Sequence, residues 1–265
     1  KRAKSRILDY KVIPTINVLD KEGKISVEIL STIGNPNIKY TLINPNNDKI
    51  SSGNIENNNL QIDIKDIELW SAESPSLYTL LLETENEVIK ERIGMREVKI
   101  ENAVLKINNV PIKLKGVNHH DSSPTKGYVV AYDDLILDLK LMKECNINSI
   151  RASHYPKSPI FYELCDEYGF YVMNEADIET HGVVELYGKG YLDNYNMIAD
   201  DKTYENVIID RIDSSIVPFK NRSCIFMWSL GNESGFGVNF ESGAKYAKEL
   251  DTTRPVHYEG AYYAS

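Results

Sequence analysis

The chain has 265 residues, enough for one large domain or two smaller ones. Hydrophobic residues make up 42% and charged residues 26%, as in ordinary water-soluble globular proteins. The net charge of −9 disfavours nucleic acid as the main partner, because phosphate binding requires a basic face.

The three cysteines, Cys145, Cys165 and Cys224, indicate a reducing compartment. Their number is odd, no CxxC pair occurs, and each lies in an apolar neighbourhood, so we expect buried free thiols. No signal peptide is visible, and the apolar runs are too short to span a membrane. The sequence therefore predicts a cytoplasmic protein without a membrane partner.

Residues 1–101 alternate between apolar and polar side chains, which is typical of half-buried strands. Turn-rich stretches containing Asn, Pro and Gly separate these segments, and few catalytic residue types occur among them. The pattern predicts a β-sandwich domain with a structural role. The expected strands lie in residues 25–29, 60–65, 77–84 and 88–100.

Residues 102–265 alternate between short apolar strands and helical segments, which predicts a parallel sheet. The expected strands are 112–117, 149–152, 170–175, 225–230 and 256–259. The expected helices are 132–145, 158–168, 204–219 and 239–250. Five strands fit either a doubly wound sheet or the first part of a (β/α)₈ barrel. No Gly-rich phosphate loop follows the first strand, which disfavours a nucleotide-binding sheet.

Polar residues gather just after the predicted strands, where parallel α/β folds form their active face. Four of the five histidines are there, namely His119, His120, His154 and His181. The second strand contains Arg151, and carboxylates follow the third and fourth strands at Glu175, Asp177, Glu179 and Glu233. A single histidine at a strand end is usually a solvated loop residue, but four on one face indicate a functional cluster.

The segment IFMWSLGNESGFG, residues 225–237, begins with a predicted buried strand. Asn232 and Glu233 follow at the C-terminal end of that strand. Glycosidic bond cleavage needs a carboxyl group on a rigid strand end, flanked by a hydrogen-bonding amide. Upstream, Glu179 and His181 are two residues apart, so both can face one way and bind Mg²⁺ or Mn²⁺. This spacing alone is weak evidence, because many surface loops contain such pairs.

Together these segments resemble the large bacterial β-galactosidases of glycoside hydrolase family 2. The matching segments, in the order of the family, are LWSAESPSLYTL, GMREVKIEN, KGVNHHD, IRASHYP, NEADIETHG, WSLGNESGFG and RPVHYEG. The resemblance implies an immunoglobulin-like sandwich followed by the first five strands of a TIM barrel. It implies a retaining hydrolase of β-galactosides such as lactose, in a parent protein that forms homo-oligomers.

The resemblance also implies roles for single residues. Glu233 matches the general acid/base, and Asn232 matches its neighbour that hydrogen-bonds the sugar 2-hydroxyl. The residues that match Mg²⁺ ligands are Glu179, His181 and Glu233. The residues that match contacts to galactose or support for the nucleophile are His120, His154 and Arg151. We expect the ion to orient Glu233, since its charge favours the carboxylate form.

The family's nucleophile lies on a later barrel strand, so we expect this chain to be a central fragment that is inactive by itself. Glu259 ends the fifth strand, but the matched segment does not make it the nucleophile. A monovalent cation site of the family would involve regions outside this chain. Two other interpretations stay open: a non-catalytic carbohydrate- or metal-binding module, and a structural fragment that pairs through its open sheet edges.

Overall fold

The computed structural model describes residues 3–187 and 194–263, and the chain divides into two compact units. The first unit contains Lys1–Ile112 with the short segments Asp166–Gly169 and Asn221–Ser223. The second unit contains Lys113–Cys165, Phe170–Lys220 and Cys224–Ser265. Among the described residues, no helix has the length and apolar character that a membrane span requires.

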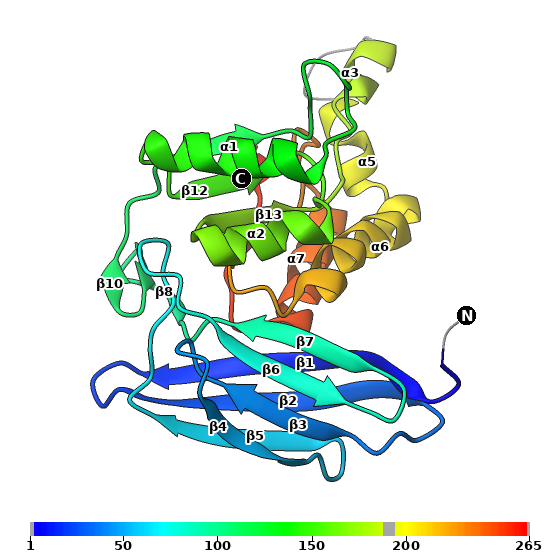
Figure 1. The fold of residues 1–265 in the computed structure, drawn as a ribbon. Coiled ribbons are helices and arrows are strands. Elements are labelled where there is room, and N and C mark those ends of the chain that lie inside the picture. Colours follow the sequence, from blue (N-terminus) through cyan, green and yellow to red (C-terminus); the bar gives the residue numbers. More distant parts are fainter. Residues whose placement is uncertain (1–2, 188–193, 264–265) are drawn as a thin grey trace. The chain divides into compact units, whose positions relative to one another are not determined.

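The first unit is built around a β-sandwich, as the alternating pattern predicts (Figure 1). One sheet has the strand order β1-β2-β5 and the other has the order β4-β3-β6-β7, with antiparallel pairing throughout. The strands are β1 (Arg6–Asn17), β2 (Glu22–Ile33), β3 (Lys39–Ile43), β4 (Lys49–Asn54), β5 (Asn59–Lys65), β6 (Tyr78–Glu83) and β7 (Val88–Ile93).

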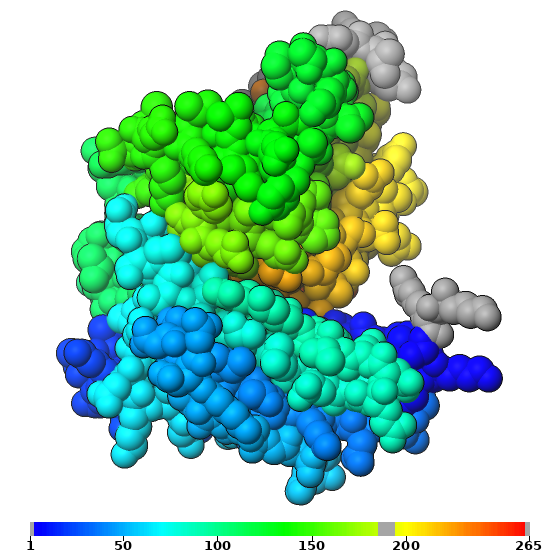
Figure 2. Space-filling view, viewed as in Figure 1, coloured from blue at the N-terminus to red at the C-terminus, as the bar shows by residue number. Residues whose placement is uncertain are grey.

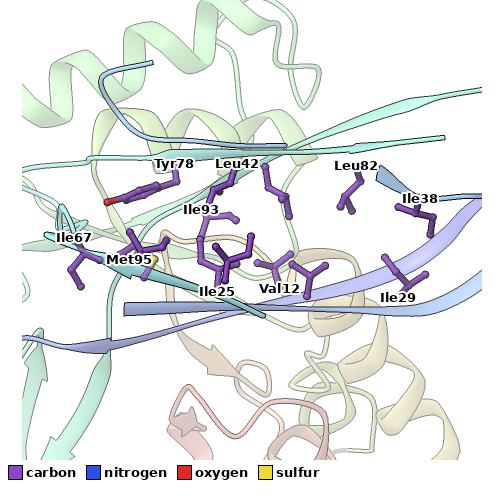
Figure 3. Packing of buried hydrophobic residues seen from close by; sticks show 14 of the residues in the cluster. Val12, Ile25, Ile29, Ile38, Leu42, Ile67, Tyr78, Leu82, Ile93 and Met95 are labelled. Atoms are coloured by element: carbon purple, nitrogen blue, oxygen red, sulfur yellow. The ribbon is translucent and has the colours of Figure 1, made fainter. Parts of the chain in front are cut away.

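Alternate side chains of these strands form the core between the two sheets. Leu42 and Leu82 of one sheet face Val12 and Ile25 of the other (Figure 3). Leu42, Leu82 and Ile25 are fully buried. Each such side chain contributes about 1.5–3 kcal/mol when it leaves water. This packing gives the unit its own hydrophobic core.

Two expectations for the region around the end of this unit were wrong. Residues 88–100 are not one strand, because β7 ends at Ile93 and β8 (Val98–Glu101) starts a separate sheet with β9 (Val104–Ile107) and β10 (Val110–Pro111). The expected strand over residues 112–117 begins later, at Gly116. The tight turn after β8 explains the small sheet, since Asn102 and Ala103 both adopt the positive φ that two-residue hairpins require.

The second unit contains a five-stranded parallel sheet with the order β11-β12-β13-β14-β15. Its strands are β11 (Gly116–His119), β12 (Ser149–Ala152), β13 (Tyr171–Glu175), β14 (Ile225–Ser229) and β15 (Val256–His257). Sheet neighbours are also chain neighbours, whereas a doubly wound sheet reverses its order at a switch point. The order is therefore that of the first part of a (β/α)₈ barrel, and it excludes the doubly wound alternative.

Helices connect these strands. They are α1 (Tyr132–Glu144), α2 (Pro159–Tyr168), α3 (Gly182–Tyr187), α5 (Met197–Asp200), α6 (Glu205–Ile216) and α7 (Val238–Leu250), with the 3₁₀ segments η1 (Lys202–Tyr204), η2 (Val217–Phe219) and η3 (Glu259–Tyr263). Helix α1 buries Leu135 and Leu139 and exposes Leu137. The segment that contains this helix forms part of the green surface in Figure 2. Cys165 and Cys224 are buried as expected, but Cys145, which follows α1, is exposed, so that expectation was wrong for this thiol.

Candidate active site

The carboxyl ends of β13, β14 and β15 bring three polar side chains into one row. The strand register places Glu175 opposite Ser229, and Ser229 opposite His257. Residues that are register partners in a parallel sheet lie side by side on the same face. The Ser229 hydroxyl accordingly contacts both neighbours, with Oγ 2.7 Å from Glu175 Oε2 and 3.3 Å from His257 Nδ1.

Glu175 is the centre of a buried hydrogen-bond network. Its side chain has no solvent exposure. Arg151 donates to it twice, from Nε to Oε2 at 2.8 Å and from Nη2 to Oε1 at 2.9 Å. His154 Nδ1 lies 2.7 Å from Oε1, and the Ser229 hydroxyl donates to Oε2. A buried carboxylate is tolerated only with such pairing, so these contacts fix the position of Arg151 and His154.

Arg151 also connects this network to the end of β14. Its Nη2 donates to Oδ1 of Asn232 at 3.0 Å. The backbone N–H of Asn232 donates to the Ile178 carbonyl at 2.8 Å, and the backbone of Asn232 forms a parallel bridge with Glu179. Because Oδ1 accepts from Arg151, the side-chain NH₂ of Asn232 is oriented to donate elsewhere. The loops after β13 and β14 are therefore joined at Asn232.

Glu233 follows Asn232 in an unusual backbone conformation. Its φ is 33°, in the left-handed region that costs a residue with a side chain about 1–3 kcal/mol. The Glu233 N–H donates to Oε1 of Glu259 at 2.8 Å. Gly231 allows the preceding turn, because its φ is 145° and a Cβ there would lie 2.7 Å from the Ile178 carbonyl oxygen. Strained residues of this kind cluster at functional sites.

The segment Glu179-Thr180-His181 runs beside the segment Asn232-Glu233-Ser234. The Thr180 N–H donates to Ser234 Oγ at 2.8 Å, and His181 Nδ1 lies 2.9 Å from Glu233 Oε2. Two adjacent ligands of an octahedral Mg²⁺ site with bonds of 2.0–2.1 Å are separated by about 3 Å, so this pair fits neighbouring ligand positions. Within residues 3–187 and 194–263, however, no three His, Cys, Asp or Glu side chains gather around one point. The backbone of Glu179 bridges Asn232, which places Glu179 in the segment beside this pair.

The side chains of His120 and Lys157 also lie at this end of the sheet. The His120 ring packs edge-on against the His154 ring, with centroids 5.2 Å apart. Burial, followed by the charge of His154, lowers the pKa of His120. Lys157 is fully buried over the Tyr155 ring and donates to the Ser153 carbonyl, and burial lowers its pKa to about 8. His120 and His154 therefore form one surface at the ends of β11 and β12.

One of the four histidines in the expected cluster does not belong to it. His119 is buried, its Nε2 lies 3.2 Å from Asp138 in α1, and its ring stacks on Phe161 in α2. Successive strand residues point to opposite faces, so His119 faces the helices while His120 faces the site.

The structure also places at this site residues to which the sequence assigned no role in binding or catalysis. They are Glu175, Ser229, His257, Lys157 and Glu259. Their common signal is position at or just beyond a strand end. Glu175 and Glu259 carried that signal in the sequence, but the contacts that give them a role join residues far apart in the chain. Only the tertiary fold could reveal those contacts.

Comparison with known proteins agrees with this architecture. Residues 5–96 match the family model described as glycosyl hydrolases family 2, and residues 98–265 match its TIM barrel domain. The chain is 49% identical to a β-galactosidase of Staphylococcus xylosus and 42% identical to one of Actinobacillus pleuropneumoniae, over 99% and 92% of its own residues. It spans 26% of the length of each of these relatives.

Solved structures give the same fold. The chain matches a β-D-glucuronidase of Dictyoglomus thermophilum with a TM-score of 0.83 and 24% identity, over 96% of this chain and 44% of that one. It matches a β-glucuronidase of an uncultured Clostridium species with a TM-score of 0.81, also at 24% identity, over 96% of this chain and 43% of that one. At this identity the likeness concerns the fold alone. With both family models covering nearly all of its residues, the chain belongs to the glycosyl hydrolases family 2.

Proposed function

We propose that this chain supplies the acid/base half of the active site of a retaining β-galactosidase. One observation carries the proposal: Glu233 stands beside Asn232 at the end of β14, and Arg151 ties Asn232 to the buried Glu175. The names of the two curated relatives support galactosides as the substrate class. Lactose as one of these substrates stays a prediction. Cytoplasmic location and assembly of the full-length protein into homo-oligomers stay predictions.

In the proposed mechanism, Glu233 gives its proton to the glycosidic oxygen while the bond from that oxygen to the anomeric carbon breaks. A carboxylate from a later barrel strand of the full-length protein bonds to the anomeric carbon, and the aglycone leaves as the alcohol. Glu233, now a carboxylate, takes a proton from water. The water oxygen then bonds to the anomeric carbon and displaces the enzyme carboxylate, which restores both groups.

The neighbouring side chains bind and orient the sugar in this proposal. The NH₂ of Asn232 donates to the 2-hydroxyl, a contact that strengthens in the transition state. His120 and His154 contact other parts of galactose, and Arg151 supports the nucleophile. The support for these roles is placement, because the Glu175 network holds both Arg151 and His154 in fixed orientations. Fixed donors avoid reorganisation during the reaction.

We also propose that Glu179, His181 and Glu233 hold a divalent cation, Mg²⁺ or Mn²⁺. This requires the Glu179 side chain to turn toward the other two, because the three side chains do not gather around one point in the described structure. Two carboxylates and an imidazole suit these ions, and the contact between His181 and Glu233 has the spacing of adjacent ligands. When bound, the ion would supply positive charge that favours the carboxylate form of Glu233.

Replacing Glu179 by Gln should weaken Mg²⁺ binding by the full-length protein about tenfold or more, because one charged ligand is lost. Isothermal titration calorimetry measures the dissociation constant directly. Asp177→Asn is the matched control, since Asp177 lies two residues away and pairs with Arg211 instead. Equal Mg²⁺ affinities for Glu179→Gln and the unmodified protein would contradict the metal proposal.

The substrate proposal is tested by comparing nitrophenyl β-galactoside with nitrophenyl β-glucuronide. The full-length protein should hydrolyse the galactoside with a kcat/KM higher by about 100-fold or more. A site whose polar groups hydrogen-bond a particular hydroxyl of the substrate strongly rejects an analogue without that hydroxyl. A preference for the glucuronide would assign the site to a different member of the family.

A further inference from the structure

The carboxylate of Glu259 is directed at the backbone of Glu233. Glu259 begins η3, two residues after the end of β15, and its Oε1 accepts a hydrogen bond from the Glu233 N–H at 2.8 Å. Bonds to a charged acceptor are among the stronger hydrogen bonds in proteins. This bond therefore holds the one residue of the turn whose side chain has to reach the substrate.

The bond acts where the backbone needs support. Glu233 has φ of 33°, a conformation that residues with a side chain rarely adopt and that persists only when the surroundings enforce it. A rotation about this residue would move its carboxyl group away from His181, which now lies 2.9 Å away. The Glu259 carboxylate is one of the contacts that enforce the conformation.

The two residues next to Glu259 hold the same turn. The Tyr258 hydroxyl donates to the Gly235 carbonyl at 2.5 Å, and the Tyr258 ring stacks on Phe240 with centroids 4.0 Å apart. A Cβ at Gly260 would lie 2.5 Å from that same carbonyl oxygen, so the two backbones are in close contact. Residues 258–260 thus support the backbone of residues 233–235.

We infer that Glu259 is a positioning residue for the proton donor, acting through the backbone amide of Glu233. This inference rests on the proposed role of Glu233. It also explains a carboxylate that stands close to the donor without being the nucleophile, because one of its oxygens is committed to a backbone N–H. The role requires an acceptor at this point rather than a second acid.

The test uses the full-length protein and two substrates that differ in their need for a proton. Phenyl β-galactoside has a poor leaving group and depends on the acid, whereas dinitrophenyl β-galactoside does not. Glu259→Leu removes the acceptor and should lower kcat/KM for the phenyl substrate on the order of 10- to 100-fold more than for the dinitrophenyl substrate. A general structural weakening would lower both equally.

Glu259→Gln keeps an amide oxygen as acceptor and should keep the ratio of the two kcat/KM values within about threefold of the unmodified protein. Glu259→Asp withdraws the acceptor by one methylene group, so it should raise the ratio of kcat/KM for the dinitrophenyl substrate to kcat/KM for the phenyl substrate. This variant replaces Glu259→Leu if Glu259→Leu does not fold. The control Asp177→Leu removes a carboxylate that pairs with Arg211, and it should leave the ratio unchanged.

Glu233→Gln serves as the reference that separates this inference from the function on which it rests. If Glu233→Gln shows the selective loss and neither Glu259→Leu nor Glu259→Asp does, the inference is overturned while the proposed function stands. If Glu233→Gln itself affects both substrates equally, the proposed function fails.

Discussion

Replacing Arg151 by Met is expected to lower the free energy of opening of the parallel sheet around Glu175 by about 3–5 kcal/mol. The methionine keeps much of the aliphatic length but removes both hydrogen bonds from the guanidinium to Glu175. Within the described part of the chain, this carboxylate without solvent exposure then keeps His154 and Ser229 as its side-chain hydrogen-bond partners. Losing one partner of a buried pair is costly because the remaining charge is left uncompensated.

Hydrogen exchange of the β13 amides in the full-length protein measures this change. Since each 1.4 kcal/mol corresponds to a factor of ten, exchange should accelerate by about 10²- to 4 × 10³-fold. Arg211→Met is the matched control, because its partner Asp177 is 56% exposed and such surface pairs contribute about 0–1 kcal/mol. Equal exchange rates in the two variants would show that the Glu175 network does not stabilise the sheet.

Replacing Glu233 by Gln is expected to lower kcat/KM for phenyl β-galactoside by about 10²–10⁴-fold, the usual contribution of a positioned acid or base. Glutamine has nearly the same shape as glutamate but cannot give a proton to the leaving oxygen. The loss should be much smaller for dinitrophenyl β-galactoside, whose leaving group needs no proton. Steady-state kinetics on the full-length protein, saturated with Mg²⁺, provides both values.

Glu241→Gln is the control for this substitution. Glu241 lies in the first turn of α7, eight residues after Glu233, and its side chain is exposed. The same chemical change there should leave both kcat/KM values unaltered. A Glu233→Gln variant that hydrolyses phenyl β-galactoside at the unmodified rate would remove Glu233 from the mechanism.

Local patterns predict most of the barrel strands but fewer details of the sandwich. The strand Ser149–Ala152 agrees with its expected bounds, because it is short, buried and bounded by clear turns. β1 was missed, since register shifts between Ile7 and Asp9 and between Asp9 and Tyr10 interrupt the alternation of its side chains. The run 88–100 is interrupted at Gly94, where a Cβ would lie 2.6 Å from the Trp70 ring. That contact joins distant parts of the sequence, so no local pattern reports it.

The candidate site likewise contains residues that the sequence pattern singled out and contacts that only the fold creates. The strand-end position singled out Glu233, Asn232 and His154, and the structure places all three at one end of the sheet. It also singled out His119, whose orientation depends on the residue at which β11 ends. The row Glu175-Ser229-His257 exists only through the register of three strands that are separated by long helical connections. Such contacts follow from the tertiary fold and not from spacing along the chain.

The most direct test of Glu233 as the proton donor is the reaction of the Glu233→Ala variant of the full-length protein with dinitrophenyl β-galactoside and azide. Removing the side chain opens a space where a small anion can attack the galactosyl–enzyme intermediate without help from a general base. We expect azide to accelerate turnover, with β-galactosyl azide identified by NMR as the product. An unchanged rate with no galactosyl azide would contradict the assignment of Glu233 as the acid/base of a retaining enzyme.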